Sequence, residues 1–333
     1  MNGKLSFIAV TCVALSMIAG AAPADELVVY SGRSKSLVAP VLKLFEKETG
    51  VRVSIKYGNT AQLALALEEE GDRSRADVFW AQDAGALGAV MKAGLFAKLP
   101  EGIETKPAEM FRQDGGMWVA TSGRARVLAY STDRVSEDAL PGSINELSGP
   151  EYRGRVGWAP ANASFQSFVT AFRRIEGEEA AEQWLIAMKE NGAKAYPKNT
   201  AIIQAIVAGE VDYGLPNHYY LLRFKKGNKD FPVAQRFFAP RDCGNLINVA
   251  GIGILRTSRN RPAAEQFVRF LLSPTAQQYF TSDVLEYPVV DGVIPNSNLV
   301  DGGKLSRVAP EIRLSDLDDL EGTLALLRRV GLL

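Results

Sequence analysis

Glu26-Leu-Val-Val-Tyr-Ser-Gly-Arg-Ser34 opens the pattern of strand and helix that decides the fold class of this chain. Apolar residues recur at helical spacing from Ser36 to Glu48, and Val51-Arg-Val-Ser-Ile-Lys-Tyr57 alternates as a second strand. The unit then repeats with a helix over 61–70, a strand over 76–81 and a helix over 84–93. Strands that alternate with helices predict a largely parallel sheet with helices on both faces.

The middle of the chain predicts a second lobe. The segment 118–132 is long, β-like and interrupted by Gly123, so it is expected to run from one lobe into the next. A strand over 154–158 and several helices follow it, and the glycine-bearing strand 249–255 is expected to carry the chain back. The amphipathic segment 317–330 is expected to pack on the second lobe. The pattern predicts two α/β lobes joined by crossing strands, with a cleft between them.

The N-terminus is typical of a secretory signal. Lys4 supplies its positive charge, residues 5–21 are almost all apolar or small, and Ala22-Pro-Ala24 is a small-x-small cleavage site. We expect residues 1–24 to be removed on secretion, leaving 309 of the 333 residues in the mature chain. Cys243 would be the single cysteine of that mature chain, so no intramolecular disulfide is expected and Cys243 is interpreted as a bystander.

Composition and motifs argue for a binding protein and against several other classes. Basic and acidic residues balance at 38 each, which favours neither nucleic acid nor an anionic membrane as a partner. His218 is the only histidine, so no Ser-His-Asp triad can form elsewhere in the chain. Neither a G-x-S-x-G elbow nor a complete nucleotide-binding glycine motif is present. We therefore predict no enzyme activity.

Asn217-His218-Tyr219-Tyr220 is the best candidate for chemistry. It follows the strand-like run 211–216 and opens a helical pattern, and ligands of open α/β sheets bind at such strand ends. Adjacent residues at a helix start project about 100° apart, so both phenols can face one cavity. The pair is either packing or a site for a hard cation, because a phenol with a pKa near 10 ionises at neutral pH only beside a strong Lewis acid such as Fe(III).

An ordered set of segments resembles the periplasmic ferric-ion-binding proteins, the substrate-binding components of bacterial iron ABC importers. The segments are Val28–Arg33, Glu70–Phe79, Ser122–Val127, Tyr152–Val156, Lys194–Asn199, Asn217–Tyr220 and Glu286–Pro288. The resemblance implies a two-lobed periplasmic binding protein (Venus flytrap, type II), with mixed sheets flanked by helices and hinge strands between the lobes. We expect an N-terminal lobe of residues 25–125 plus 250–304 and a C-terminal lobe of 126–249 plus 305–333.

The resemblance also implies a function. Fe(III) would bind in the cleft of a monomer and pass to a membrane ABC permease with a separate ATPase. The family's adjacent tyrosine ligands correspond to Tyr219 and Tyr220. The histidine, glutamate and third tyrosine that other branches use are replaced here by Ser34, Gln82-Asp83 and Phe165. Asp83 and Gln82 are candidate further ligands, and Asp83 is alternatively a helix cap. His218 is expected to have a supporting or structural role.

Fe(III) favours six ligands, so the resemblance implies that a synergistic anion, carbonate or phosphate, completes the shell with water. The candidate anion-binding residues are Asn162, Ala163, Ser164, Asn199, Asn217, Ser34 and Arg33. Exposed N–H groups and the dipole at a helix start favour an anion there, although each polar residue is alternatively a cap. Arg33 is expected to balance charge at the cleft mouth. Iron can arrive free or chelated on this reading, and the same fold could instead bind a phosphonate, a sugar phosphate or a polyamine.

Overall fold

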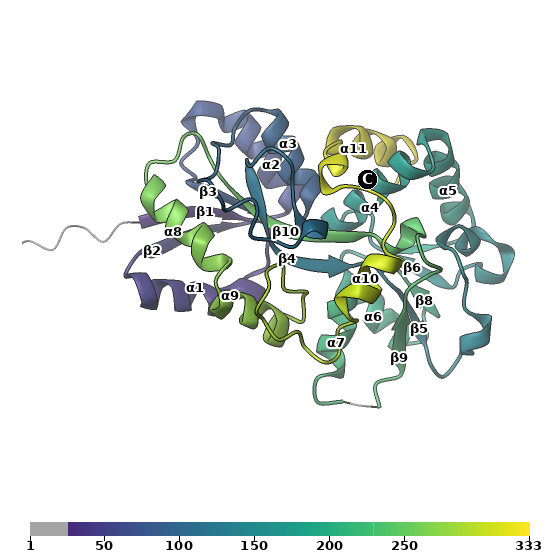
Figure 1. Cartoon of the computed structure of the whole chain (residues 1–333). Coiled ribbons are helices and arrows are strands. Elements are labelled where there is room, and N and C mark those ends of the chain that lie inside the picture. Colours follow the sequence, from purple (N-terminus) through teal and green to yellow (C-terminus); the bar gives the residue numbers. More distant parts are fainter. Residues whose placement is uncertain (1–25, 229) are drawn as a thin grey trace, which may run out of the picture.

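The computed structural model describes residues 26–228 and 230–333, so the predicted signal peptide of residues 1–24 lies outside it. Two five-stranded sheets organise the chain, each the centre of one lobe, side by side in Figure 1. In the described residues, no helix is both long and apolar enough to cross a membrane.

The first sheet has the strand order β2-β1-β3-β10-β4 and is mixed. β1 pairs in parallel with β2 and β3, whereas β10 is antiparallel to β3 and β4. Its strands are β1 (Glu26–Ser31), β2 (Arg52–Tyr57), β3 (Val78–Ala81), β4 (Trp118–Ala125) and β10 (Ile247–Ile254). The helices of this lobe are α1 (Lys35–Thr49), α2 (Thr60–Glu70), α3 (Ala84–Lys92), α8 (Arg261–Leu271) and α9 (Pro274–Tyr279).

The second sheet has the order β7-β6-β8-β5-β9 and is mixed as well. Its strands are β5 (Leu128–Ser131), β6 (Val156–Trp158), β7 (Lys194–Ala195), β8 (Tyr213–Gly214) and β9 (Val233–Arg236). The helices around it are α4 (Ala163–Ile175), α5 (Glu178–Glu190), α6 (Asn199–Val207) and α7 (His218–Lys225). The predicted mixed sheets with flanking helices are thus confirmed.

The predicted crossing strand over 118–132 is two strands, β4 and β5, in different sheets. The break falls at Arg126-Val127 and not at Gly123, which lies inside β4. A Cβ atom on Gly123 would come within 2.6 Å of the Phe111 ring, so this glycine permits close packing and does not end the strand. β9 leads back into β10, and β4 and β10 lie side by side across the middle of Figure 1.

Aromatic side chains fill the core of each lobe. Trp80 and Phe45 pack against Phe267 with ring centroids 5.7 and 4.9 Å apart in the first lobe. In the second lobe, Trp158 packs against Phe165 with ring centroids 5.6 Å apart. Edge-to-face pairs of this kind stabilise a core beyond the area they bury. Buried apolar residues of the two lobes form one continuous cluster, and these aromatic pairs are its centres in each lobe.

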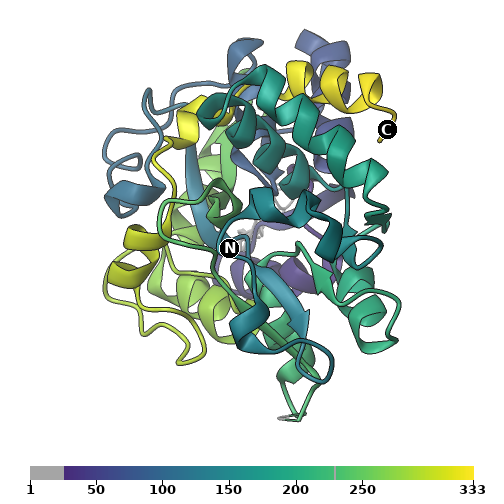
Figure 2. The same cartoon turned by 90° about the vertical axis from the view of Figure 1, so that its right-hand side faces the viewer.

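The C-terminal segment contacts both lobes. It contains α10 (Gly302–Val308) and α11 (Leu320–Arg329), and α11 packs on α4 of the second lobe and also on α3 of the first. Figure 2 shows α11 in yellow beside the teal helices of the second lobe. The predicted helix over 317–330 is shorter than expected, since Leu314–Leu317 is a 3-10 turn. The predicted lobe boundaries stay a prediction.

Candidate functional site

Tyr219 and Tyr220 lie side by side in the first turn of α7, directly after β8. Their ring centroids are 4.2 Å apart and the planes are tilted by 31°. Tyr219 is 0% exposed, and its hydroxyl has no hydrogen-bond partner among residues 26–228 and 230–333. A buried hydroxyl without a partner is unfavourable, by about 1–3 kcal/mol. Its position fits a group that gains its partner from a ligand.

A buried charged cluster faces the tyrosines. Both guanidinium Nη atoms of Arg33 donate to the carboxylate of Glu286, at 2.9 and 2.8 Å, and Ser122 Oγ donates to the same carboxylate at 2.5 Å. Arg124 donates Nη2 to the Val249 carbonyl at 3.1 Å. Its Nε and Nη1 have no partner in the described part of the chain. Two buried guanidiniums beside one carboxylate leave an excess of positive charge.

The pKa of Tyr219 depends on its burial and on these neighbouring charges. Burial raises the pKa of Tyr219 well above its ordinary value, and the neighbouring charges of Tyr220 and Glu286 raise it further. Arg124 and Arg33 oppose that rise. The hydroxyl therefore stays protonated at neutral pH, and a cation that binds it must displace the proton.

Arg33 lies deeper than the sequence indicated. It was expected at the mouth of the cleft, but it is only 1% exposed and paired with Glu286. Glu286 lies in the segment Glu286–Pro288 that carries the resemblance, but the sequence predicts no role for it. The signal was present, because Glu286 is a lone acid in the apolar run Val284-Leu285-Glu286-Tyr287 and a buried arginine needs such a partner.

The starts of α4, α6 and α7 carry the predicted anion-binding residues. Asn162 Oδ1 accepts from the Ser164 N–H at 3.1 Å and from Ser164 Oγ at 2.6 Å, so Asn162 caps α4, ahead of buried Ala163. Asn217 Nδ2 donates to Ser164 Oγ at 3.2 Å, which joins the start of α7 to that of α4. The structure thus brings Asn162, Ser164 and Asn217 together.

Two of these asparagines keep unused polar atoms. Within the residues that the structure describes, Asn199 has no partner for either side-chain atom and Asn217 has none for Oδ1. Both side chains are buried, at 0% and 1% exposure. Because buried amides are almost always hydrogen-bonded, their arrangement fits a polar ligand between the helix starts.

Asp83 and Gln82 lie at the start of α3. Asp83 Oδ1 accepts from the Ala86 N–H at 3.0 Å and from Ser167 Oγ of α4 at 3.0 Å. Asp83 thus caps its helix and links the two lobes, while Oδ2 has no partner in the described chain. Burial raises the pKa of Asp83 against the opposing pull of Ala86, Arg124 and Ser167. Gln82 is half-buried.

We expect Asp83→Ala to lower the free energy of unfolding by about 1 kcal/mol, the usual effect of losing an N-cap. The visible absorption of bound Fe(III) should keep its maximum, because Oδ1 is engaged with Ala86 and Ser167 and the charge of the carboxylate is attracted to Arg124. Thermal denaturation and an absorption spectrum of the iron-loaded variant measure both quantities. A shifted maximum would instead make Asp83 a ligand.

The remaining candidates are Ser34, Phe165 and His218. Ser34 is exposed, and its Oγ lies 3.4 Å from Ser36 Oγ. Phe165 belongs to the core beside Trp158. Burial lowers the pKa of His218 to about 4, so it is neutral. Its Nδ1 accepts from the Ala125 N–H at 3.1 Å and its Nε2 donates to the Leu285 carbonyl at 2.9 Å, which anchors α7 to β4.

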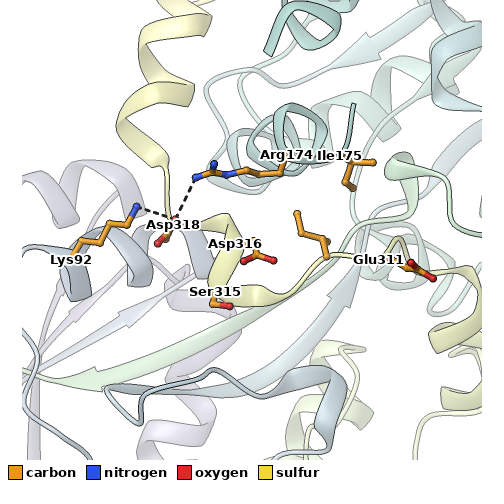
Figure 3. Close-up of a pocket in the computed structure, with 8 residues that line it drawn as sticks. Lys92, Arg174, Ile175, Glu311, Ser315, Asp316 and Asp318 are labelled. Atoms are coloured by element: carbon orange, nitrogen blue, oxygen red, sulfur yellow. Dashed lines mark ion pairs between the residues drawn. The ribbon is translucent and has the colours of Figure 1, made fainter. Parts of the chain in front are cut away.

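A separate hollow of about 660 Å³ lies where the C-terminal segment crosses between the lobes (Figure 3). Asp318 pairs there with Lys92 of α3 at 3.0 Å and with Arg174 of α4 at 3.9 Å. The charges of Lys92, Arg174 and Asp318 in this hollow are therefore paired with one another. In Figure 1, α3 and α11 lie at the upper side and α7 at the lower side, so this hollow is remote from the tyrosines. It is not the candidate site.

The chemistry of the site follows from its donors. No group of three or more His, Cys, Asp and Glu side chains is placed to hold a metal in the described ranges. Tyr219 and Tyr220 are hard oxygen ligands, whereas the unpaired Nδ2 of Asn199 and the unpaired Nε and Nη1 of Arg124 can donate to an anion. The arrangement can hold a hard cation together with a small anion.

Comparison with known proteins places the chain in a family. Residues 74–308 match the family model described as bacterial extracellular solute-binding protein. The chain is 34% identical over 324 residues to the major ferric iron-binding protein of Neisseria meningitidis, covering 96% of this chain and 97% of that protein.

Solved structures agree. The fold is similar to that of iron-bound HitA from Pseudomonas aeruginosa, with a TM-score of 0.87 at 33% identity over 92% of this chain and 99% of that one. It is also similar to a Trichodesmium protein (IdiA, FutA) in complex with iron and citrate, with a TM-score of 0.76 at 28% identity over 92% of this chain and 100% of that one. The two-lobed binding-protein fold is confirmed, and the chain belongs to the periplasmic ferric-ion-binding family of bacterial extracellular solute-binding proteins.

Proposed function

We propose that this protein captures Fe(III) with a synergistic anion between its lobes and delivers it to an ABC permease driven by a separate ATPase. It acts as a periplasmic monomer after removal of residues 1–24, and it binds and releases its cargo without catalysis. The observation that carries the proposal is the adjacent phenol pair, with the buried hydroxyl of Tyr219 unpaired in the described chain. The names of the relatives and neighbours, which bind ferric iron, support the same cargo.

A count of charges supports the anion. Two phenolates reduce the charge of Fe(III) from +3 to +1, and Arg33 is compensated by Glu286. Arg124 and the deeply buried Arg126 have no acidic partner within 4.0 Å in the described ranges. The loaded site would thus keep a positive charge unless an anion entered with the metal. Carbonate and phosphate fit that role, and so does the citrate present in the Trichodesmium complex.

The asparagines and Ser164 are proposed to hold this anion on the second lobe. The N–H groups at the starts of α4, α6 and α7 are the natural donors. Fe(III) then binds Tyr219 and Tyr220, and the first lobe closes over it with Asp83 meeting Ser167. The chain crossings beside β4 and β10 would absorb that hinge motion.

The test is an equilibrium titration of the iron-free protein with Fe(III) in the presence of bicarbonate, phosphate or citrate. A visible charge-transfer band with a one-to-one endpoint is expected, since phenolate-bound Fe(III) absorbs there. Binding of a phosphonate or sugar phosphate in the absence of iron, without such a band, would favour the alternative cargo that unpaired Arg124 could also accept.

Iron affinity should fall as the pH falls. The pKa of Tyr219 is raised by burial, so its proton must leave when the metal binds. If both phenols release a proton, affinity falls by up to about 100-fold per pH unit. Competition against a chelator of known pH-dependence between pH 5 and 7.5 measures this. A flat profile would contradict phenolate ligation.

A further inference from the structure

The C-terminal segment is in contact with both lobes on the side where α3 and α11 lie in Figure 1, remote from the tyrosines. Residues 311–319, the C-terminal strap, lead from α10 into α11 and contain the 3-10 turn Leu314–Leu317. This turn packs on α3 of the first lobe and on α4 of the second, and α11 packs on the same two helices. A segment that packs on both lobes bears on how the lobes move relative to each other.

Buried polar contacts fix the end of the strap to the second lobe. Arg173 of α4 donates Nη2 to the Asp319 carboxylate at 2.9 Å and Nη1 to Thr323 Oγ1 of α11 at 2.9 Å. The hydroxyl oxygens of Thr323 and Thr170 lie 2.7 Å apart, and both side chains are buried. Buried hydrogen-bonded groups are costly to separate, so the strap moves together with α4.

Two glycines of α3 let the strap approach the first lobe closely. A Cβ atom on Gly88 would lie 2.4 Å from Cβ and 2.8 Å from Cα of Asp318. A Cβ atom on Gly85 would lie 2.9 Å from the carbonyl oxygen of Leu317. Real Cβ atoms are essentially never found at such distances, so an alanine at either position would force α3 and the strap apart. The docked strap therefore depends on glycine at these two positions.

Asp318 also joins the lobes by charge (Figure 3). Its Oδ1 lies 3.0 Å from Nζ of Lys92 on α3 and 3.9 Å from Nη2 of Arg174 on α4. One carboxylate of the strap thus pairs with a cation from each lobe. Both cations are about half exposed, so each ion pair is weak, and the glycine packing contributes more.

The same helix α3 carries the other contact between the lobes. Asp83 at its start accepts from Ser167 Oγ of α4 at 3.0 Å, and a Cβ atom on Gly85 would lie 3.1 Å from that oxygen. Because α3 belongs to the first lobe and the strap is fixed to α4, rotation of the lobes makes or breaks these contacts together. The arrangement with the strap docked is therefore the one in which Asp83 meets Ser167, which is the closed arrangement of the proposed function.

We propose that the C-terminal strap is a latch that stabilises the closed arrangement of the lobes and so sets the iron affinity from a position remote from the metal. This inference rests on the proposed function. A contact made in only one arrangement shifts the population toward it, and the apparent affinity of a ligand falls with the fraction of protein that can bind. Gly88 and Asp318 are positioning residues that act through the orientation of the lobes.

Gly88→Ala tests the packing of the strap. Alanine favours a helix more than glycine does, so thermal denaturation of the iron-free protein should show no loss of stability. The added methyl group displaces Asp318, and overpacking of this kind should weaken Fe(III) binding with bicarbonate on the order of 10-fold. The visible band should keep its maximum, because the phenols are untouched. Gly302→Ala in α10 is the matched control, since a Cβ atom there has no neighbour within 4 Å, and it should leave the affinity unchanged.

Asp318→Asn tests the charge of the strap and adds no atom to the packing, so it keeps the test decisive if Gly88→Ala folds poorly. It should weaken iron binding about 2- to 5-fold, and added salt should reduce the difference from wild type. Asp316→Asn is the matched control. It removes the same charge from the same hollow, but Asp316 pairs at 3.0 Å with Arg313 inside the strap. The affinity of Asp316→Asn should equal that of the wild-type protein.

Titrations of these variants and the wild-type protein with Fe(III) and bicarbonate, followed by the visible band, give the dissociation constants. Unchanged or tighter iron binding in both Gly88→Ala and Asp318→Asn would overturn the latch, and so would equal weakening in Asp318→Asn and Asp316→Asn. In either case the proposed function would stand, because the wild-type protein still shows the band. Absence of the band in the wild-type protein would overturn the proposed function itself.

Discussion

Tyr219→Phe is expected to abolish Fe(III) binding while leaving the iron-free protein at least as stable as before. The hydroxyl that it removes is fully buried and has no partner in the described chain. Ligand loss should exceed the about 10- to 100-fold effect of removing a group that only supports a ligand. Removal of an unpaired buried hydroxyl should at the same time relieve up to about 1–3 kcal/mol of desolvation penalty.

These two outcomes are measured together by metal titration and by thermal denaturation of the iron-free protein. Tyr130→Phe is the matched control, because Tyr130 is also buried in the second lobe but donates its hydroxyl to Glu137 at 3.1 Å. It should keep the band and lose about 1 kcal/mol of stability. A Tyr219→Phe protein that binds iron normally would show that its hydroxyl is a packing feature.

The tyrosine pair illustrates how far the sequence leads. A strand ending at a helix start is a local pattern, and it correctly predicts that Tyr219 and Tyr220 share one turn of α7 after β8. The mixed sheets followed from the resemblance, since alternation alone predicted a largely parallel arrangement. β10 is antiparallel to both of its neighbours because the chain enters it from the other lobe.

Contacts between distant residues were not predictable from local patterns. Arg33 and Glu286 are separated by 253 positions and meet only because β10 returns the chain to the first lobe ahead of α9 and the turn that carries Glu286. Asp83 makes one local contact and one contact with a distant residue. Its capping of α3 is local and was anticipated, whereas its bond to Ser167 depends on how the lobes meet.

The replacement of family ligands acquires a physical meaning in the structure. Ser34, which the resemblance predicts at the position of a histidine ligand, lines a cavity of about 530 Å³ with Tyr220, Lys198 and Arg223. Gln82 is half-buried beside capping Asp83. The second lobe thus supplies the protein ligands of the proposed site, and the first lobe supplies charge through Arg33 and Arg124. Such a division favours a cargo that brings part of its own coordination shell.

Glu286→Gln is expected to lower the free energy of unfolding by about 3–5 kcal/mol, because it leaves a buried guanidinium without its counter-charge. Burial alone would raise the pKa of Glu286, but the charge and hydrogen bonds of Arg33, with Arg124 and Ser122, outweigh it and hold the pKa below its ordinary value. A carboxyl with a depressed folded pKa stabilises the protein above its unfolded pKa and loses that effect as the pH falls through the folded one.

Wild-type stability should therefore decline below about pH 4.5, and this part of the decline should be absent in Glu286→Gln. Urea denaturation between pH 3 and 7 measures both proteins. Removing the partner as well, in Arg33→Met/Glu286→Gln, should restore much of the loss, since replacing both members of a buried pair is far less costly than orphaning one. A double variant no more stable than Glu286→Gln would mean that the carboxylate stabilises the fold through Ser122 and Arg124, and that Arg33 does not depend on it.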